Sequence, residues 1–400
     1  MKKTAWIRIC AALLLCAGLF QIAFAAPETA QWTLDEDAVH MITLNIGKAD
    51  CIILTAGSRR FMVDTGYEQT AGMMLTALDS LGITKLDGVF ITHDDKDHVG
   101  GLARLLKSGV QVDAVYAPAF SVDQRDEDHP VISAAALRDM TPVFLDAGAV
   151  LTFDDLSFTV LGPREQNLDN ENNNSLVMTF LTPQGAILLT GDMKLEEEYT
   201  LLRAGVFTHC EVLKVTFHGD NSAMSISLLN AVKPRMAVIP TSTEQEPDTP
   251  HKDTLRALAS VGCETYVTQD MSDALLITLK DGKPSARDVR WALPDAVTGL
   301  TLRIKLSKDM LYIGNAGETD VTLDGATLFS TRGEDLFALP DGLLIPAGQE
   351  ISVTSSNSGG AADVVLESKK RIWHKSKYDA AVLYDRYGRV LARTDNGLSE

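Results

Sequence analysis

The stretch ITHDDKDHVGG, residues 91–101, constrains this 400-residue chain more than any other. It places two His and three Asp in the six positions from His93 to His98. An apolar run precedes it and paired glycines follow, so we expect it at the end of a buried strand, on the turn into a helix. Imidazoles and carboxylates at this spacing suit a divalent cation, but a solvated acidic loop also fits the stretch taken alone.

Three further stretches each end an apolar run with an acidic residue or a His. They are VDTG with Asp64, LLTGD with Asp192 and KVTFHG with His218. Side chains at strand ends are held by a rigid sheet and converge on one crevice, so the four stretches together indicate one metal site.

The order of residues within the motif predicts two metal centres. His93 and Asp95 alternate along an extended segment and point the same way, toward one centre. Asp97 and His98 lie on the following turn and face a second centre. Two cations a few ångström apart need a shared carboxylate, and Asp192 is the natural bridge.

From His40 to about Lys280, short β runs alternate with stretches of helical periodicity. The first three β runs (MITLNI, CIILTA and RRFMVDTG) are close together and predict antiparallel pairing. Residues 38–280 are therefore predicted to form an α/β domain in which sheets and helices are layered. Cys51 falls in one of these runs, where a small buried residue is the expected role.

The composition changes after residue 280. Residues 281–298, rich in Pro, Gly and charge, are predicted to be a linker. Residues 299–395 show β alternation with hardly any helical period, which predicts a separate all-β, immunoglobulin-like sandwich.

The first 25 residues have the features of a signal peptide. Lys2, Lys3 and Arg8 precede an apolar run that ends in Ala23-Phe24-Ala25, a small-x-small cleavage site; a membrane anchor is the alternative. We therefore expect an exported chain, extracellular or periplasmic, with no membrane span after cleavage. Its net charge would move from −18 to −21, which repels nucleic acid at long range unless bound cations make the site positive.

Residues 38–280 resemble the metallo-β-lactamase fold, an αββα sandwich with a two-metal site, and are most similar to the hydrolase domain of ComEC-type DNA-uptake proteins. LNIGKADCIIL, FMVDTG, H-x-D-x-D-H-x-G-G, ENNNSLVMTF, ILLTGDM and EVLKVTFHG carry the resemblance, in that order. It implies that one metal is held by His93 and Asp95, and the other by Asp97, His98 and His218, with Asp192 bridging.

The same resemblance gives roles to residues around the metals. Asp64 would orient a ligand, and Asn172, Asn174 and Ser175 would line the site beside the first metal, with Ser175 where many members of the fold have a His. Lys48 and Lys96 would add positive charge or would simply be solvated.

The sequence departs from the family pattern at Phe217 and Thr249, which each replace a usual His, and at Asp220 and Ala223, where small hydroxyl residues are common. A site rich in carboxylates and poor in His admits Mn²⁺ as well as Zn²⁺.

Residues 299–395 resemble the lamin-tail domain, through N-x-G, L-x-G, P-x-G and LYD-x-x-G. This module would be a stabilising appendage, or it would tether the chain to cell wall, nucleic acid or another protein. Trp373 and His374 are expected in its core or rim.

The sequence predicts an exported hydrolase with two divalent metal ions, a phosphodiesterase or nuclease acting on a phosphodiester such as DNA. A wall-polymer phosphoesterase of the phosphorylcholine esterase kind is one alternative. The other is a non-catalytic exported binding protein on a decayed hydrolase scaffold.

Overall fold

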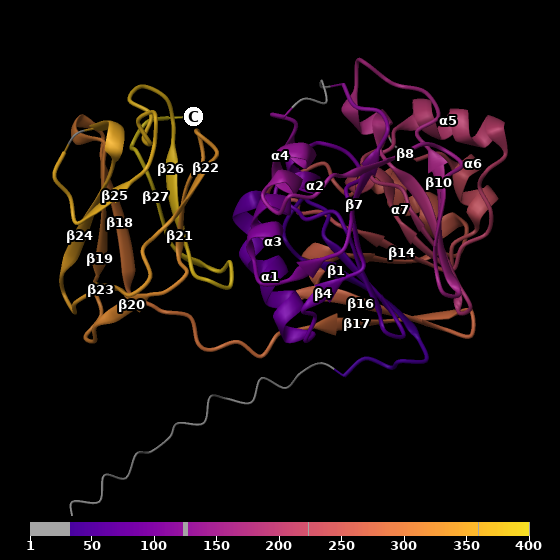
Figure 1. Cartoon of the computed structure of the whole chain (residues 1–400), viewed down its shortest axis with the longest axis horizontal. Helices are drawn as coiled ribbons and strands as arrows, with labels where there is room; N and C mark the ends of the chain where they lie inside the picture. The colour runs from indigo at the N-terminus through magenta and orange to yellow at the C-terminus, as the bar shows by residue number, and fades with distance from the viewer. Residues whose placement is uncertain (1–32, 123–126, 223, 359, 400) are drawn as a thin grey trace, which may run out of the picture.

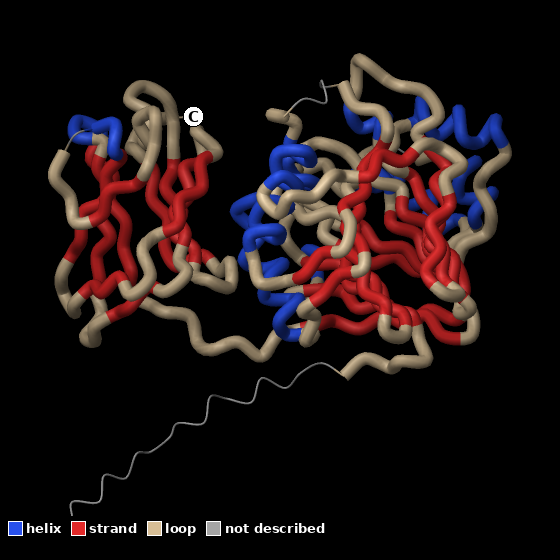
Figure 2. Tube along the Cα trace, in the orientation of Figure 1, coloured by secondary structure: helices blue, strands red, loops and turns tan. Residues whose placement is uncertain are grey.

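The computed structural model describes residues 33–122, 127–222, 224–358 and 360–399, which form two domains (Figure 1). Helices cover the outer faces of the first domain, whereas the second consists almost entirely of strands and loops (Figure 2). The predicted signal peptide, residues 1–25, lies outside the described residues. Within the described ranges, no helix has both the length and the apolar character needed to cross a bilayer.

The first sheet has eight strands in the order β17-β16-β1-β2-β3-β5-β7-β8. Its bounds are β1 Val39–Leu44, β2 Ile52–Ala56, β3 Arg59–Val63, β5 Gly88–Phe90, β7 Val115–Pro118, β8 Val143–Leu145, β16 Ala274–Lys280 and β17 Lys283–Val289. β1, β2 and β3 pair antiparallel, as predicted, and β3, β5, β7 and β8 are parallel.

The second sheet has seven strands in the order β15-β14-β13-β12-β11-β10-β9. Its bounds are β9 Val150–Phe153, β10 Leu156–Gly162, β11 Val177–Thr182, β12 Gly185–Leu189, β13 Val212–Lys214, β14 Met236–Ile239 and β15 Glu264–Val267. The strands from β12 to β15 are parallel, so their carboxyl ends meet at one edge. A two-stranded sheet joins β4 (Lys85–Leu86) to β6 (Gln111–Val112).

Three apolar layers make the αββα arrangement. The central layer lies between the sheets and includes Met41 and Phe158; the outer layers pack helices on each sheet. The adjacent residues Met41 and Ile42 belong to different layers and are both buried, because strand side chains alternate between two covered faces. The helices are α1 Ala71–Ser80, α2 Lys96–Val99, α3 Leu102–Lys107 and α4 Pro130–Ala136, then α5 Leu195–Ala204, α6 Ile226–Val232 and α7 Lys252–Ser260.

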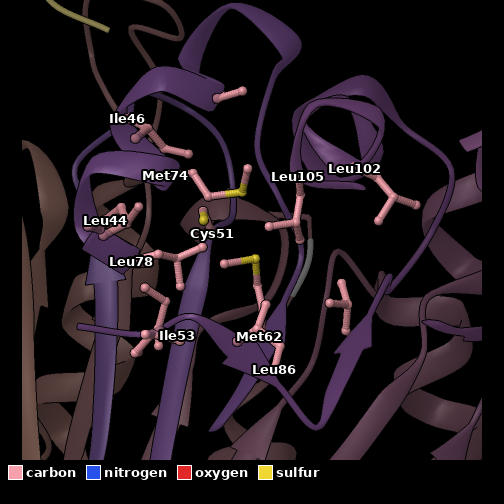
Figure 3. Packing of buried hydrophobic residues seen from close by; sticks show 14 of the residues in the cluster. Leu44, Ile46, Cys51, Ile53, Met62, Met74, Leu78, Leu86, Leu102 and Leu105 are labelled. Atoms are coloured by element: carbon pink, nitrogen blue, oxygen red, sulfur yellow. The ribbon is translucent and has the colours of Figure 1, made fainter. Parts of the chain in front are cut away.

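The layer beneath α1 and α3 fixes the strands that lead to the site. Figure 3 shows Cys51 among Met74, Leu78 and Met62 in this layer. Like Cys210 and Cys263, Cys51 is buried and forms no disulfide. Burial also raises the pKa of the Cys51 thiol, so it acts as a small apolar residue, as predicted.

The predicted linker, residues 281–298, needs a correction. Residues Lys283–Val289 form β17, which pairs antiparallel with β16 at the edge of the first sheet. Four of its seven side chains are exposed, so the segment has no continuous apolar run that would indicate a strand. Irregular chain from Arg290 to Gly299 then leads to the second domain.

The second domain has two four-stranded sheets, ordered β18-β19-β24-β25 and β22-β21-β26-β27, and the pair β20-β23. Its bounds are β18 Leu300–Lys305, β19 Met310–Asn315, β20 Val321–Leu323, β21 Thr327–Ser330, β22 Asp335–Ala338, β23 Leu343–Ile345, β24 Glu350–Ser355, β25 Val364–Leu366, β26 Ala380–Tyr384 and β27 Val390–Asp395. Trp373 is buried in its core, and His374 lies half-buried beside it.

The two domains touch through glycines. A Cβ on Gly72 of α1 would lie 2.7 Å from the backbone nitrogen of Gly388, in the turn between β26 and β27. Only a residue without a side chain allows this approach. The Arg389 guanidinium also donates to Pro294 O at 2.7 Å.

Candidate metal centre

The predicted metal ligands and Asp64 each follow a strand whose carboxyl end points to the same edge of the domain. Asp64 follows β3, the segment from His93 to His98 follows β5, Asp192 follows β12, and His218 lies after β13 in the 3-10 turn Thr216–Gly219. These strands come from both sheets, so the side chains meet where the two sheets open.

Four of these side chains, Asp97, His98, Asp192 and His218, form a buried group that we call the Asp192 cluster. His218 Nε2 lies 3.0 Å from Asp192 Oδ2 and 3.3 Å from Asp97 Oδ2. His98 Nε2 lies 3.3 Å from the same Asp192 oxygen. One ligand atom from each residue lies within 4.8 Å of the others, which is compact enough to surround a single cation.

The other ring nitrogen of each His in the cluster is already engaged. His98 Nδ1 donates to Asp64 Oδ2 at 2.8 Å, and His218 Nδ1 donates to Pro240 O at 2.6 Å. Because a carbonyl or carboxylate only accepts, each Nδ1 carries a proton, and Nε2 is the ring nitrogen that faces the cluster.

Charge within the cluster is balanced by pairing. Burial opposes protonation of His98 and His218, but Asp192 and the nearby carboxylates outweigh burial and raise the pKa of both imidazoles. Burial would raise the pKa of Asp97 and Asp192, but the two imidazoles lower it. The carboxylates are therefore ionised, the state in which they bind cations.

Asp64 is placed by an unusual backbone. Its φ is 58°, in the left-handed region that few residues other than Gly adopt. In this conformation it accepts hydrogen bonds from Thr92 N and Thr92 Oγ1, both at 2.7 Å, as well as from His98. Asp64 therefore lies behind His98 and fixes its ring, the position expected of an orienting residue.

A buried ion pair between Lys214 and Asp50 contacts the cluster, and sequence reasoning gave neither residue a role. Lys214 Nζ lies 2.5 Å from Asp50 Oδ2 and 3.2 Å from Asp192 Oδ1, and it donates to Gly191 O at 2.8 Å. Both residues are buried. Lys214 occupies one oxygen of Asp192, so Oδ2 is the oxygen that faces the two imidazoles. The sequence feature that could have indicated a role for Lys214 is its position as the single charged residue in the apolar run VLKV.

His93 and Asp95, which we call the His93 pair, lie beside the cluster and are held less firmly. His93 Nε2 is 3.5 Å from Asp95 Oδ2; His93 is fully buried, whereas the Asp95 side chain is 46% exposed. The rings of His93 and His98 are 4.1 Å apart, so the pair borders the cluster. Ser175 Oγ lies 3.4 Å from His93 Nδ1 and accepts a hydrogen bond from Asp192 N at 3.0 Å.

Asn172 and Asn174 have contacts within their own loop. Asn172 Nδ2 donates to Asn170 Oδ1 at 3.1 Å, and Asn174 Nδ2 donates to Asn167 O at 2.8 Å. The described contacts of both side chains therefore hold the loop before β11. Of the predicted lining residues, Ser175 is the one that contacts His93 and Asp192.

The exposed edge of the centre is cationic and aromatic. Lys48 Nζ lies 3.0 Å from Asp97 Oδ2 and 5.8 Å from the centre of the Phe217 ring. Lys194 Nζ lies 4.2 Å from the same ring. Phe217 has φ 44° and is half-exposed, and strained residues of this kind gather at functional sites. Lys48 is therefore an ion-pair partner of the site, not a freely solvated lysine.

Tyr67 is a further residue at this edge that sequence reasoning missed. Burial, with the nearby carboxylates of Asp97, Asp192 and Glu334, raises the pKa of its hydroxyl well above the usual value. The hydroxyl therefore stays protonated and can act as a donor.

The donor set fits divalent metal ions. The Nε2 atoms of His93, His98 and His218 are buried and have no hydrogen-bond partner among the described residues. Buried polar atoms are rarely left unpaired, and three imidazole nitrogens beside ionised carboxylates are typical metal ligands.

Residues 44–242 match the sequence profile of the Metallo-beta-lactamase superfamily, so the chain carries a metallo-β-lactamase domain. That domain is homologous to competence proteins of the ComEC type. ComE operon protein 3 of Bacillus subtilis is 28% identical over 241 residues, 56% of this chain and 30% of that protein. Competence protein ComA of Neisseria gonorrhoeae is 25% identical over 259 residues, 64% of this chain and 34% of that protein.

Recombination protein 2 of Haemophilus influenzae is also similar, with 25% identity over 232 residues, 57% of this chain and 26% of that protein. The matched region therefore spans only about a third or less of these relatives. Among solved structures, the metallo-beta-lactamase fold protein YhfI of Bacillus subtilis covers 60% of this chain and 99% of its own, with 13% identity and a TM-score of 0.40.

Proposed function

We propose that this chain is a metal-dependent phosphodiesterase that acts on nucleic acid. The observation that carries the proposal is the Asp192 cluster, whose buried imidazoles and ionised carboxylates converge on one point beneath a cationic rim. The names of the competence proteins are consistent with a nucleic-acid substrate.

In this proposal Asp97, His98, Asp192 and His218 would hold one cation. The His93 pair would hold a second, with Asp192 as the carboxylate available to both. Divalent cations in such a centre activate water and neutralise charge on the phosphoryl group. The mixture of carboxylates and imidazoles suits Mn²⁺ as well as Zn²⁺.

The surrounding residues bind and orient the substrate. Lys48, 3.0 Å from Asp97, contributes positive charge where a phosphate would lie. Phe217 replaces a polar family residue with an aromatic face, on which a nucleobase can stack. Tyr67 keeps its proton and supplies a hydrogen-bond donor at the rim.

We extend the proposal to the whole chain. Residues 1–25 would act as a signal peptide, so that the chain works outside the cytoplasm, and residues 299–395 would be a lamin-tail-like module. Secretion of the full-length chain, with a mature protein that begins after Ala25, would test the first point.

A substrate panel tests the activity. The purified chain is loaded with Mn²⁺ or Zn²⁺ and incubated with DNA, RNA and bis-p-nitrophenyl phosphate, with the Asp192→Asn variant as control. Hydrolysis of at least one polynucleotide that is lost in the variant supports the proposal. A metal-loaded wild type that cleaves none of the three overturns it, and cleavage of phosphorylcholine-bearing wall polymer alone assigns the wall-polymer activity instead.

A further inference from the structure

The second domain carries a basic segment that the metal centre does not explain. Residues 369–377 read KKRIWHKSK, with five Lys or Arg and no Asp or Glu. Residues 299–400 contain 12 basic and 14 acidic residues, a net charge of −2, so residues 1–298 contribute −16 of the total −18. The segment is therefore a cationic surface on the least acidic part of an acidic protein.

The backbone of this segment is held firmly while its cations face solvent. It joins β25 to β26, and the Trp373 side chain is buried in the core. Asp309 accepts from Trp373 N, and Asp379 accepts from His374 N, each at 3.0 Å. Because the backbone is fixed, the lysines are displayed at defined positions rather than on a loose tail.

Two hollows flank the segment, with volumes of about 630 and 620 Å³. Arg332 lines both. The first also contains Lys377, Tyr378 and Arg393, and the second contains Lys369 and Lys375. Each hollow therefore combines several cations, and the first adds an aromatic ring, which together suit a polyanion with flat bases.

Most of these cations have no carboxylate partner in the part of the chain that the structure describes. Lys370 pairs with Asp335 at 3.0 Å, and Arg371 lies 3.6 Å from Asp309. Among the described residues, the other five have no carboxylate within ion-pair distance; they are Arg332, Lys369, Lys375, Lys377 and Arg393. We call these five residues the basic patch.

The turn that carries Arg332, at one end of the basic patch, contacts the first domain close to the metal centre. Arg332 and Gly333 lie in the turn between β21 and β22, and the next residue, Glu334, pairs with Lys96 Nζ across the domain boundary. Lys96 directly precedes Asp97 of the cluster. Glu334 is also near enough to affect the pKa of Tyr67 at the rim of the site. Figure 1 shows α2, which begins at Lys96, on the side of the first domain that faces the β-sandwich.

We propose that the basic patch binds the phosphodiester backbone of a single nucleic-acid strand and leads it toward the metal centre. The inference rests on the proposed function, for which it names the substrate-binding surface. Elsewhere the acidic surface repels such a strand at long range, so a local cationic track of this kind is where the strand can approach. Tyr378, half-buried in the first hollow, would stack on a base.

Charge reversal with a matched control tests the inference. The patch variant is Lys369→Glu, Lys375→Glu, Lys377→Glu, and the control is Lys233→Glu, Arg235→Glu, Lys283→Glu. The control residues are exposed. Lys233 and Arg235 lie between α6 and β14, and Lys283 is the first residue of β17, away from the strand ends that carry the site. Binding of a fluorescein-labelled 30-nucleotide single-stranded DNA to the full chain is measured by anisotropy, in EDTA so that nothing is cleaved.

We expect the patch variant to bind at least ~10-fold more weakly, with a slope of log K against log[salt] that is smaller by roughly 2, because three phosphate contacts are lost. The control should bind within about 2-fold of the wild type. Equal binding by patch variant and wild type would overturn the inference, as would equal competition by polyphosphate and DNA at the same phosphate concentration.

Hydrolysis separates this inference from the proposed function. With metal, the patch variant should lose at least ~10-fold more activity on the 30-nucleotide strand than on bis-p-nitrophenyl phosphate, which is too small to span the patch. If wild type binds DNA through the patch but cleaves no phosphodiester, the proposed function fails and the patch stands. The opposite case is a wild type that cleaves both substrates and a patch variant whose activity falls equally on both or on neither. The proposed function then stands, and the role of the basic patch in binding the strand is overturned.

Discussion

The Asp192 cluster and the His93 pair lie side by side but differ in how firmly their side chains are held. In the cluster, His98 is fixed by Asp64, His218 by Pro240 O and Asp192 by Lys214. In the pair, Asp95 is half-exposed, and Ser175 Oγ lies 3.4 Å from His93 Nδ1, the ring nitrogen that does not contact Asp95.

We infer from this difference that one half of the centre binds its metal ion tightly and the other half leaves room for water and substrate. Ligands fixed by outer partners bind a metal tightly, because little side-chain freedom is lost when it binds. A pair with one half-exposed carboxylate leaves coordination positions free for water and substrate. We therefore expect the cluster to retain its ion through purification and the pair to exchange its ion readily.

Asp192→Asn should have the largest effect, because in the proposed centre Asp192 is the carboxylate shared by both halves. We expect both ions to be lost and hydrolysis of bis-p-nitrophenyl phosphate to fall by about 10³-fold or more. Elemental analysis and initial rates measure the two effects. The conservative change at an exposed carboxylate, Asp154→Asn, should alter neither. An Asp192→Asn variant that keeps two ions would exclude the bridging role.

Lys214→Met should destabilise the cluster side by about 3–5 kcal/mol, because it leaves Asp50 and Asp192 as buried carboxylates without their cation. Urea unfolding of the metal-free chain measures the loss. The double variant Asp50→Asn, Lys214→Met should recover a large part of it, since one buried charge is removed with its partner. If the double variant is as unstable as the sum of the two single variants, the ion pair is not the cause.

Much of the fold follows from the sequence. The antiparallel pairing of β1, β2 and β3 could be predicted because they are apolar runs separated by short turns, so each pairs with a strand close to it in the sequence. β17 is not predictable in the same way, because its exposed alternation KPSARDV gives no apolar run and its place depends on pairing with β16. β22 and β23 give a weak sequence signal for a similar reason, because they are only four and three residues long and lie between Gly- and Pro-bearing turns.

The same limit applies to the site. His93, Asp97 and His98 stand together in one motif at a strand end, so their convergence could be expected. The partners of the cluster could not, because Lys214 reaches Asp50 across 164 positions of sequence, through the register of strands in different sheets. The contact between Lys96 and Glu334 depends on how two domains pack, which no local pattern encodes.

Asp95→Ala should have a smaller effect than Asp192→Asn, because it removes a ligand from the His93 pair alone. We expect one ion to remain, and the affinity for the second to fall by about 10- to 100-fold. Titration of the metal-free protein with Mn²⁺, followed by electron paramagnetic resonance, resolves the two sites. Asp97→Ala is the matched change in the cluster and should weaken the tight site instead. Loss of the tight ion from Asp95→Ala would remove the distinction between the halves.

Glu197→Gln should have the smallest effect, and this effect should depend on pH. Glu197 of α5 accepts a hydrogen bond from Arg164 N at 3.1 Å, at the start of the loop that brings Ser175 to His93. Burial raises the pKa of Glu197 to about 7, well above that of an exposed Glu. The folded state therefore holds a proton that the unfolded state releases, so this group's contribution to stability is present below about pH 4.5 and is lost as pH rises through 7.

Gln keeps the oxygen that accepts from Arg164 and cannot ionise, so Glu197→Gln should be more stable than the wild type by about 1–2 kcal/mol at pH 8 and nearly equal to it at pH 5. Thermal unfolding at the two pH values measures the difference. Glu244→Gln, at an exposed position, should show no such dependence. An equal gain at both pH values would mean that the substitution acts through packing and not through ionisation. A gain at pH 8 alone would show that ionisation of the buried Glu197 carboxyl is what destabilises the wild type as pH rises.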